Sequence, residues 1–178
     1  MSDDASMLLR TISWCTEPPS SVLPDHIGDW LRETGSMTQR LEKYCAQLEV
    51  TLCREGFITS QVLDEEREQL PFSESYWLRE VVLYGDGRPW LFGRTLVPQQ
   101  TLNGADAALT EIGNQPLGRY LFEQKALMRD YIHTGCCEGL WARRSRLCLS
   151  GGPLLLTELF LPEAPVYFTP GDEGWQVI

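Results

Sequence analysis

One arginine interrupts an apolar strand pattern in the middle of the chain. The segment from Tyr76 to Tyr84 is rich in aromatic and β-branched residues, which favours a β-strand. Because successive side chains of a strand point to opposite faces, Arg79 shares a face with Trp77 and Val81. A guanidinium on such a face needs a carboxylate partner or an anionic ligand.

One glutamate holds a similar position near the end of the chain. In the predicted strand from Leu154 to Leu161, Glu158 shares a face with Leu156 and Phe160. The other face of this strand is mostly apolar as well, so we expect both faces to be buried and Glu158 to have little access to water.

Two interpretations of these charges remain open from the residues alone. The first is an internal ion pair between Arg79 and Glu158. The second is a ligand pocket, in which Arg79 binds a carboxylate at one end and Glu158 faces a hydroxyl or ether oxygen at the other.

Two predicted helix starts add groups that can bind anions. Ser36 followed by Gln39 fits a capping box, which makes Met37 the first helical residue. Pro116 suits the first position of another helix, which runs through Leu117. The first turn of a helix has free backbone N–H groups and a partial positive charge.

Three further arginines are less strongly predicted to contact a ligand. Arg94 lies on a stripe with Trp90, Phe92 and other apolar residues, and Arg144 and Arg146 share the face of a later strand. For these we expect the usual surface arrangement, in which the stem covers apolar residues and the charged head stays in water.

The cysteines and histidines do not form a metal or nucleophile motif. The chain has six cysteines without a C-x-x-C pair, and its two histidines are His26 and His133. Cys136 and Cys137 lack a basic partner in the sequence, so we interpret them as packing residues. Glycine-rich nucleotide loops are absent too. We therefore expect no metal and no cofactor.

The predicted elements indicate an α+β fold on an antiparallel sheet. Gly85-Asp86-Gly87 is a strong hairpin signal between two of the strands. After Pro162 the chain is rich in proline, glycine and acid, and we expect a loosely held tail over residues 168–178. The predicted strands are 48–53, 76–84, 90–97, 143–149 and 154–161, and the predicted helices are 25–33, 105–112, 117–123 and one beginning at Met37.

Composition limits the partners and the compartment. At 178 residues without repeats, residues 1–178 are expected to form one domain. The net charge of -10 argues against nucleic-acid binding. We find no apolar run of about 20 residues and no secretory signal, so we expect a cytoplasmic protein without a membrane span, and a monomer.

Six stretches of the chain form a recognisable set, namely Ser36–Thr38, Arg54–Phe57, Tyr76–Glu80, Pro116–Phe122, Arg143–Ser145 and Leu154–Pro162. Together they resemble the chorismate pyruvate-lyase family of bacterial ubiquinone biosynthesis. The resemblance runs in family order from Thr11 to Tyr167, whereas residues 168–178 extend beyond the family pattern and Cys136-Cys137 has no counterpart in it.

The resemblance implies a fold, a reaction and a site. The fold would be a single domain with a six-stranded antiparallel sheet and helical flaps over a buried ligand. The reaction would be the cofactor-free conversion of chorismate to 4-hydroxybenzoate and pyruvate by a carbon–oxygen lyase. The family's ligand-binding positions fall on Met37, Arg79, Leu117 and Glu158, with Arg79 and Glu158 as the catalytic pair.

Two other function classes remain as alternatives. The lyase fold resembles effector-sensing domains of bacterial regulators, which bind a ligand without changing it. Those regulators carry a basic DNA-binding domain, whereas this chain is acidic. A purely structural protein would leave Arg79 and Glu158 without an explanation. Formation of 4-hydroxybenzoate from chorismate distinguishes all three.

Overall fold

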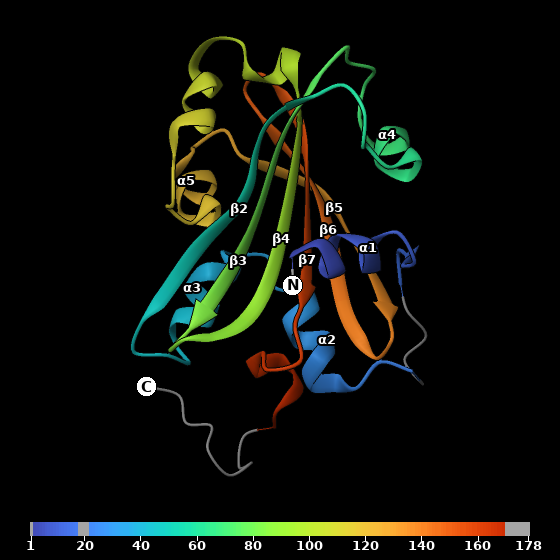
Figure 1. Cartoon of the computed structure of the whole chain (residues 1–178), viewed down its shortest axis with the longest axis vertical. Coiled ribbons are helices and arrows are strands. Elements are labelled where there is room, and N and C mark those ends of the chain that lie inside the picture. Colours follow the sequence, from blue (N-terminus) through green and yellow to red (C-terminus); the bar gives the residue numbers. More distant parts are fainter. Residues whose placement is uncertain (1, 18–21, 170–178) are drawn as a thin grey trace.

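A seven-stranded antiparallel sheet forms the centre of the molecule (Figure 1). The computed structural model describes residues 2–17 and 22–169, and the strand order is β1-β5-β6-β7-β4-β3-β2. The strands are β1 (Ser13–Cys15), β2 (Leu48–Ile58), β3 (Tyr76–Gly85), β4 (Arg88–Pro98), β5 (Met128–Cys137), β6 (Leu140–Leu149) and β7 (Gly152–Phe160).

The expected number of six strands is wrong, because a short edge strand adds a seventh. Three residues of β1 pair antiparallel with β5, with Ser13 opposite Cys136 and Cys15 opposite Thr134. A strand of this length carries too few residues to show an alternating pattern in the sequence. The α+β class and the antiparallel pairing are confirmed.

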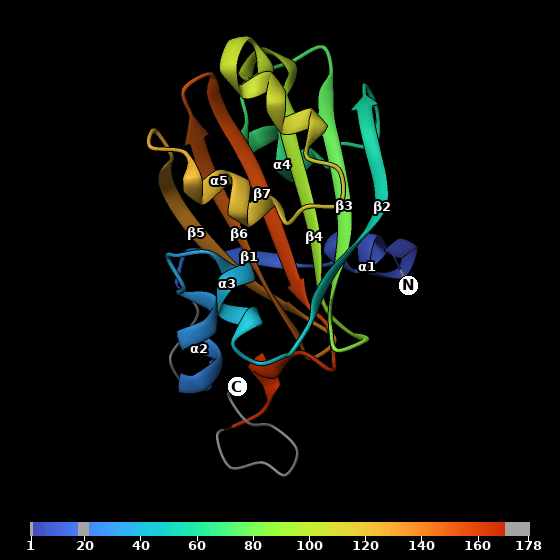
Figure 2. The same ribbon diagram turned by 90° about the vertical axis from the view of Figure 1, so that its left-hand side faces the viewer.

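Helices cover both faces of the sheet. The helices α2, α3 and α5 lie over one face, which we call the front, and α1 and α4 lie over the other, the back (Figures 1 and 2). The α-helices are α1 (Ser2–Leu9), α2 (Asp25–Leu31), α3 (Met37–Glu42), α4 (Asp64–Gln69) and α5 (Leu117–Glu123), and the 3₁₀ helices are Gln99–Leu102, Gly104–Glu111 and Pro165–Tyr167.

The central strands are buried on both sides, as the continuous apolar patterns of β3 and β7 predict. On the front, Trp30 of α2 packs with Val81 and Phe160. On the back, Leu9 of α1 packs in one cluster with Phe92. A charged side chain that points to either face therefore has to find its partners inside the protein.

The hairpin between β3 and β4 has the predicted turn. Asp86 and Gly87 adopt φ angles of 48° and 79°, the left-handed conformations that a tight hairpin requires. The Asp86 carboxylate also accepts hydrogen bonds from the backbone N–H groups of Ala46 and Gln47. This turn sets the register that places Arg79 opposite Thr95.

The helix predicted over residues 105–112 is a 3₁₀ helix instead, Gly104–Glu111. In a 3₁₀ helix residues three apart point the same way, and here Asp106 and Leu109 are the two buried side chains. Asp106 accepts hydrogen bonds from the Gly151 N–H and the Ser150 hydroxyl, so its position is fixed by the β6–β7 turn. Tertiary contact overrides the local helix preference here.

The chain directly after Pro162 is packed, contrary to the expectation of a loosely held end. Ala164 and Val166 are fully buried. The Tyr167 hydroxyl accepts a hydrogen bond from the Trp141 N–H and donates one to the Phe160 carbonyl, both at 2.8 Å. Of the tail expected at 168–178, residues 170–178 lie outside the described part of the chain.

Candidate functional site

A cavity lies between the front face of the sheet and the first turns of α3 and α5. Its volume is about 40 Å³, whereas a cavity of about 150 Å³ can hold benzene. A ring-sized ligand can enter only if the covering helices or the lining side chains move. The apolar lining includes Val50, Val81, Leu83, Leu91, Phe122 and Leu156, and the polar lining includes Thr38, Arg79, Thr95, Arg129, Arg143 and Glu158.

The two predicted helix starts meet at this cavity. Met37 and Leu117, the first residues of α3 and α5, both line it and both are buried. The Ser36 hydroxyl caps α3 by accepting the Gln39 N–H at 3.3 Å, as the sequence predicts. Backbone N–H groups of two helix starts are therefore available near one small volume.

Glycine at position 118 allows this close approach. A Cβ atom on Gly118 would lie 2.9 Å from Thr38 Oγ1 and 3.0 Å from Ser36 Oγ. Both distances are shorter than ordinary van der Waals contacts, so any side chain here would push α5 away from α3. The close contact of the two helices thus depends on the absence of a side chain at Gly118.

Arg79 enters the cavity from β3 and is 1% exposed. Its Nη1 donates to Glu55 Oε2 at 2.9 Å and to the Gly113 carbonyl at 2.6 Å, and its Nη2 donates to the Gln115 carbonyl at 2.9 Å. Arg79 therefore holds the segment that leads into α5.

Part of the Arg79 guanidinium remains free for another partner. Within the described ranges, its buried Nε has no hydrogen-bond partner. Nη2 carries two hydrogens and makes one hydrogen bond. Nε and Nη2 together form an edge that suits a carboxylate with two oxygens. A buried donor without a partner is costly, and an anionic ligand would satisfy it.

Glu158 enters the same cavity from β7 but does not pair with Arg79. Its Oε2 accepts a hydrogen bond from Arg143 Nε at 2.5 Å, and both side chains are almost fully buried. The interpretation of an internal Arg79–Glu158 ion pair is therefore wrong. The register of the sheet explains the difference, because Arg143 lies directly opposite Glu158 on β6, whereas Arg79 pairs with Thr95.

Sequence reasoning missed Arg143 and Arg129, although both line the cavity. Arg143 lies two residues before Ser145 and four before Leu147, which places it on an inward face of β6. This spacing of two residues is the sequence signal from which a buried Arg143 could have been predicted. Arg129 lies on β5, whose sequence mixes charged, aromatic and small residues and gives no alternating pattern.

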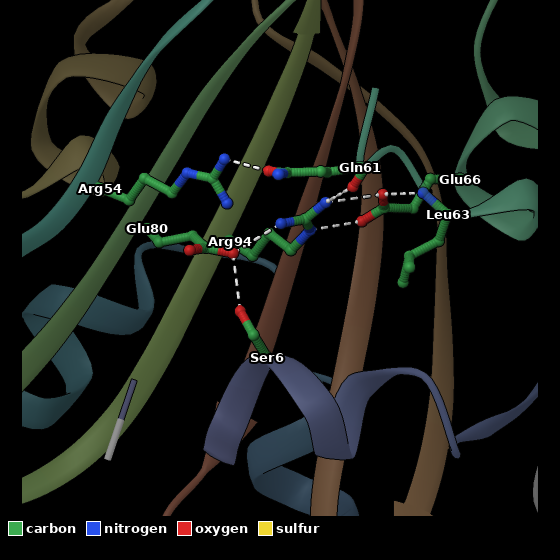
Figure 3. A network of polar contacts seen from close by, with 7 residues as sticks. All are labelled: Ser6, Arg54, Gln61, Leu63, Glu66, Glu80 and Arg94. Atoms are coloured by element: carbon green, nitrogen blue, oxygen red, sulfur yellow. Dashed lines mark hydrogen bonds and ion pairs between the residues drawn. The ribbon is translucent and has the colours of Figure 1, made fainter. Parts of the chain in front are cut away.

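Arg94 lies on the back of the sheet, at the centre of a buried network of ion pairs and hydrogen bonds (Figure 3). Its Nε donates to Glu66 Oε1 at 2.7 Å, and its Nη1 donates to Glu80 Oε1 at 2.5 Å. Glu80 also accepts the Ser6 hydroxyl of α1 at 2.8 Å, and Glu66 belongs to α4. This buried network attaches both back helices to the sheet, so the expectation that the Arg94 head stays in water is wrong.

The remaining arginines of β6 are also on the back face. Arg144 is buried, with its guanidinium carbon 4.6 Å from the centre of the Trp14 ring, so its head is not in water either. Arg146 is partly exposed and pairs with Asp130 at 3.5 Å, as expected for a surface arginine. Neither lines the front cavity.

A family model described as chorismate lyase matches residues 8–170. The chain belongs to the chorismate lyase family. A protein of Pectobacterium atrosepticum named chorismate pyruvate-lyase is 86% identical over 178 residues, which is 100% of both chains. One of Yersinia enterocolitica with the same name is 55% identical, over 94% of this chain and 99% of its own length.

A solved structure shares the fold of this chorismate lyase family member at low sequence identity. The crystal structure of a Staphylococcus aureus gene product matches with a TM-score of 0.51 and 8% identity, over 72% of this chain and 89% of that chain. The four positions that the family resemblance indicates, Met37, Arg79, Leu117 and Glu158, all line the front cavity. Their roles toward a ligand remain predictions.

The thiols and histidines of this chorismate lyase family member lie apart from the described cavity lining. All six cysteines are free, and burial raises the pKa of Cys45 to about 11. His133 stacks on Tyr131, and burial lowers its pKa. Within residues 2–17 and 22–169, no group of three or more acidic, cysteine or histidine side chains could hold a metal ion. In the same ranges, no helix is long and apolar enough to span a membrane.

Proposed function

We propose that this protein removes pyruvate from chorismate and releases 4-hydroxybenzoate, the step that supplies the ring of ubiquinone. The observation that carries the proposal is the 86% identity, over the whole chain, to a protein named chorismate pyruvate-lyase. A cavity that combines a cation, a carboxyl group and an apolar wall supports the same reaction.

The ring carboxylate of chorismate binds to Arg79 in this proposal. The free Nε and the remaining Nη2 hydrogen form a planar edge for its two oxygens. Backbone N–H groups at Met37 and Leu117 add neutral donors from the two helix starts. The bonds from Arg79 to Gly113 and Gln115 couple ligand binding to the segment ahead of α5.

Glu158 faces the other end of the ring, where the hydroxyl and the enolpyruvyl ether lie on neighbouring carbons. The bond between ring carbon three and the ether oxygen breaks, and carbon four loses its hydrogen as a proton. The enolpyruvyl group takes up a proton and becomes pyruvate, so the atoms of chorismate are fully divided between the two products. In this proposal Glu158 takes up a proton when chorismate binds, exchanges its ion pair with Arg143 for a neutral contact, and acts as general acid toward the departing group.

Aromatisation drives this reaction, so the protein has to supply only orientation and charge placement. We therefore propose a reaction without metal or cofactor. We also keep the cytoplasmic location and the monomeric state as predictions from the sequence. Because the cavity is smaller than a ring-sized ligand, we propose that α3 and α5 separate to admit chorismate and close over it afterwards.

The test is to incubate the purified protein with chorismate, with and without EDTA, and to measure 4-hydroxybenzoate and pyruvate. We expect equal amounts of both products, and no effect of EDTA. Arg79→Ala should lower kcat/KM by about 100-fold or more, since losing one partner of a buried charge contact is costly. Stoichiometric binding of chorismate without turnover would instead indicate a ligand-sensing module.

A further inference from the structure

Arg129 is a cation in the cavity that has no carboxylate partner among residues 2–17 and 22–169. Its Nη1 donates to the Ser145 hydroxyl, and its Nη2 donates to the Thr34 carbonyl at 3.3 Å. Its guanidinium carbon lies 5.8 Å from the centre of the Phe122 ring. In the part of the chain that the structure describes, no Asp or Glu oxygen lies within the 4.0 Å of an ion pair. These neutral contacts orient the charge without neutralising it.

Burial and a neighbouring arginine disfavour the charge of Arg129 more than nearby carboxylates favour it. Burial, and after it Arg143, lower the pKa of Arg129, whereas Glu158 and Glu33 act in the opposite direction. Arg143 itself is bound to Glu158. The ionisable side chains that line the cavity are three arginines and one glutamate. Glu55, outside the lining, is paired with Arg79, so these five groups have a formal charge of 3 − 2 = +1 when all are charged. This excess of positive charge suits an anionic ligand.

In the orientation proposed above, the second carboxylate of chorismate lies near Arg129. The enolpyruvyl group is attached to ring carbon three, next to carbon four with its hydroxyl. If the hydroxyl faces Glu158, the carboxylate of the enolpyruvyl group projects beside Glu158, where Arg143 and Arg129 lie. In the same orientation the ring carboxylate binds to Arg79, which lines the cavity from β3.

We propose that Arg129 is the specificity residue of the site, which binds the carboxylate of the enolpyruvyl group and so distinguishes chorismate from 4-hydroxybenzoate. This inference rests on the proposed function, because it takes its substrate from there. 4-Hydroxybenzoate keeps the ring carboxylate and the hydroxyl but has no second carboxylate. Arg129 therefore contributes to the binding of substrate and contributes little to the binding of product.

A pair of matched ligands tests the inference independently of turnover. 4-Hydroxybenzoate is compared with its 3-carboxymethoxy derivative, which carries a second carboxylate on carbon three. Both are titrated by calorimetry against the wild-type protein, Arg129→Gln and Arg129→Lys. Arg129→Gln should weaken binding of the derivative by about 10- to 100-fold, the contribution of a charge-assisted hydrogen bond. Binding of 4-hydroxybenzoate should change by less than about threefold.

Kinetics and a control variant complete the test. kcat/KM for chorismate should fall with Arg129→Gln and recover in part with Arg129→Lys, which keeps the charge but not the planar fork. Arg146→Gln removes a cation from the back face of β6 and should change none of these values. If Arg129→Gln does not fold, as judged by its melting curve, the comparison of the two ligands is made on Arg129→Lys.

Two results would overturn the inference. Equal weakening of both ligands would show that Arg129 only maintains the shape of the cavity. Unchanged affinity for the derivative would show that its second carboxylate binds elsewhere. Failure of the wild-type protein to convert chorismate would be a different result, because it contradicts the proposed function while the two-ligand comparison can still be made.

Discussion

Arg143 and Glu158 face each other on the neighbouring strands β6 and β7, joined by a hydrogen bond of 2.5 Å from Arg143 Nε to Glu158 Oε2. The side chains are 1% and 6% exposed. Arg143 is fixed on its other side by the Glu33 carbonyl, 2.6 Å from Nη1. Glu158 is therefore held in place by a residue of the sheet and does not occupy the Nε–Nη2 edge of Arg79.

The first prediction concerns the stability of this pair. Arg143→Met should lower the free energy of unfolding by about 3–5 kcal/mol, because it leaves the Glu158 carboxylate buried without its partner. The double variant Arg143→Met with Glu158→Leu should regain much of that loss, since no charge is then left alone. Urea unfolding measures both. Additive losses in the double variant would show that the two side chains do not stabilise each other.

The second prediction concerns the slow step of turnover. 4-Hydroxybenzoate can keep the contacts of its carboxylate and its oxygen, and the covering helices must separate before it leaves. Rapid mixing with chorismate should give a burst of about one 4-hydroxybenzoate per active site, followed by a slower steady rate. A linear time course, together with weak inhibition by added 4-hydroxybenzoate, would show that the chemical step is slow instead.

The third prediction concerns the contact between α3 and α5. Gly118→Ala introduces a methyl group 2.9 Å from Thr38 Oγ1, so the two helix starts have to move apart. Such overpacking costs about 1–3 kcal/mol, which should raise the inhibition constant of 4-hydroxybenzoate by about 5- to 150-fold. Removing the facing oxygen with Thr38→Ala in the same protein should restore part of the affinity. An unchanged inhibition constant for Gly118→Ala would mean that the closed contact does not hold the product.

The fourth prediction concerns the end of the described chain. Tyr167→Phe removes the hydroxyl that joins the Trp141 N–H to the Phe160 carbonyl, and should destabilise the fold by about 1–3 kcal/mol. A variant that lacks residues 168–178 is compared with Tyr167→Phe. Its kcat/KM for chorismate should stay within about twofold of the wild-type value, because all proposed ligand contacts lie before residue 168. Thermal unfolding measures the stability of the two variants, and the chorismate assay measures their kcat/KM. A larger loss of stability from the deletion than from Tyr167→Phe would assign the tail a structural role.

The sequence was informative where a charged residue interrupts a mostly apolar strand. Arg79 and Glu158 could be identified because their strands, β3 and β7, are apolar enough to be buried on both faces, and both residues line the cavity. Met37 and Leu117 followed from the capping pattern and from proline, which are local signals. These four positions required no knowledge of how the strands pair.

The pairing itself could not be predicted from local patterns. Arg143 becomes the partner of Glu158 through the register between β6 and β7, and Glu55 becomes the partner of Arg79 through the register between β2 and β3. Arg129 lies on a strand whose sequence does not alternate between apolar and polar residues. Neither the strand itself nor the face to which Arg129 points could therefore be predicted. Arg94 looked like a surface residue because its partner Glu66 lies 28 positions away, in a helix that short-range patterns did not reveal.

The most direct test of the account is the effect of Glu158→Gln on catalysis and on product binding. The amide keeps the shape and the hydrogen bonds of the carboxyl group but cannot deliver a proton, so kcat should fall by about 100- to 10,000-fold. The inhibition constant of 4-hydroxybenzoate should stay within about threefold of the wild-type value. The control Glu163→Gln changes an exposed carboxylate just beyond β7 and should leave both values unchanged. A Glu158→Gln protein with the wild-type kcat would contradict the assignment of Glu158 as the general acid.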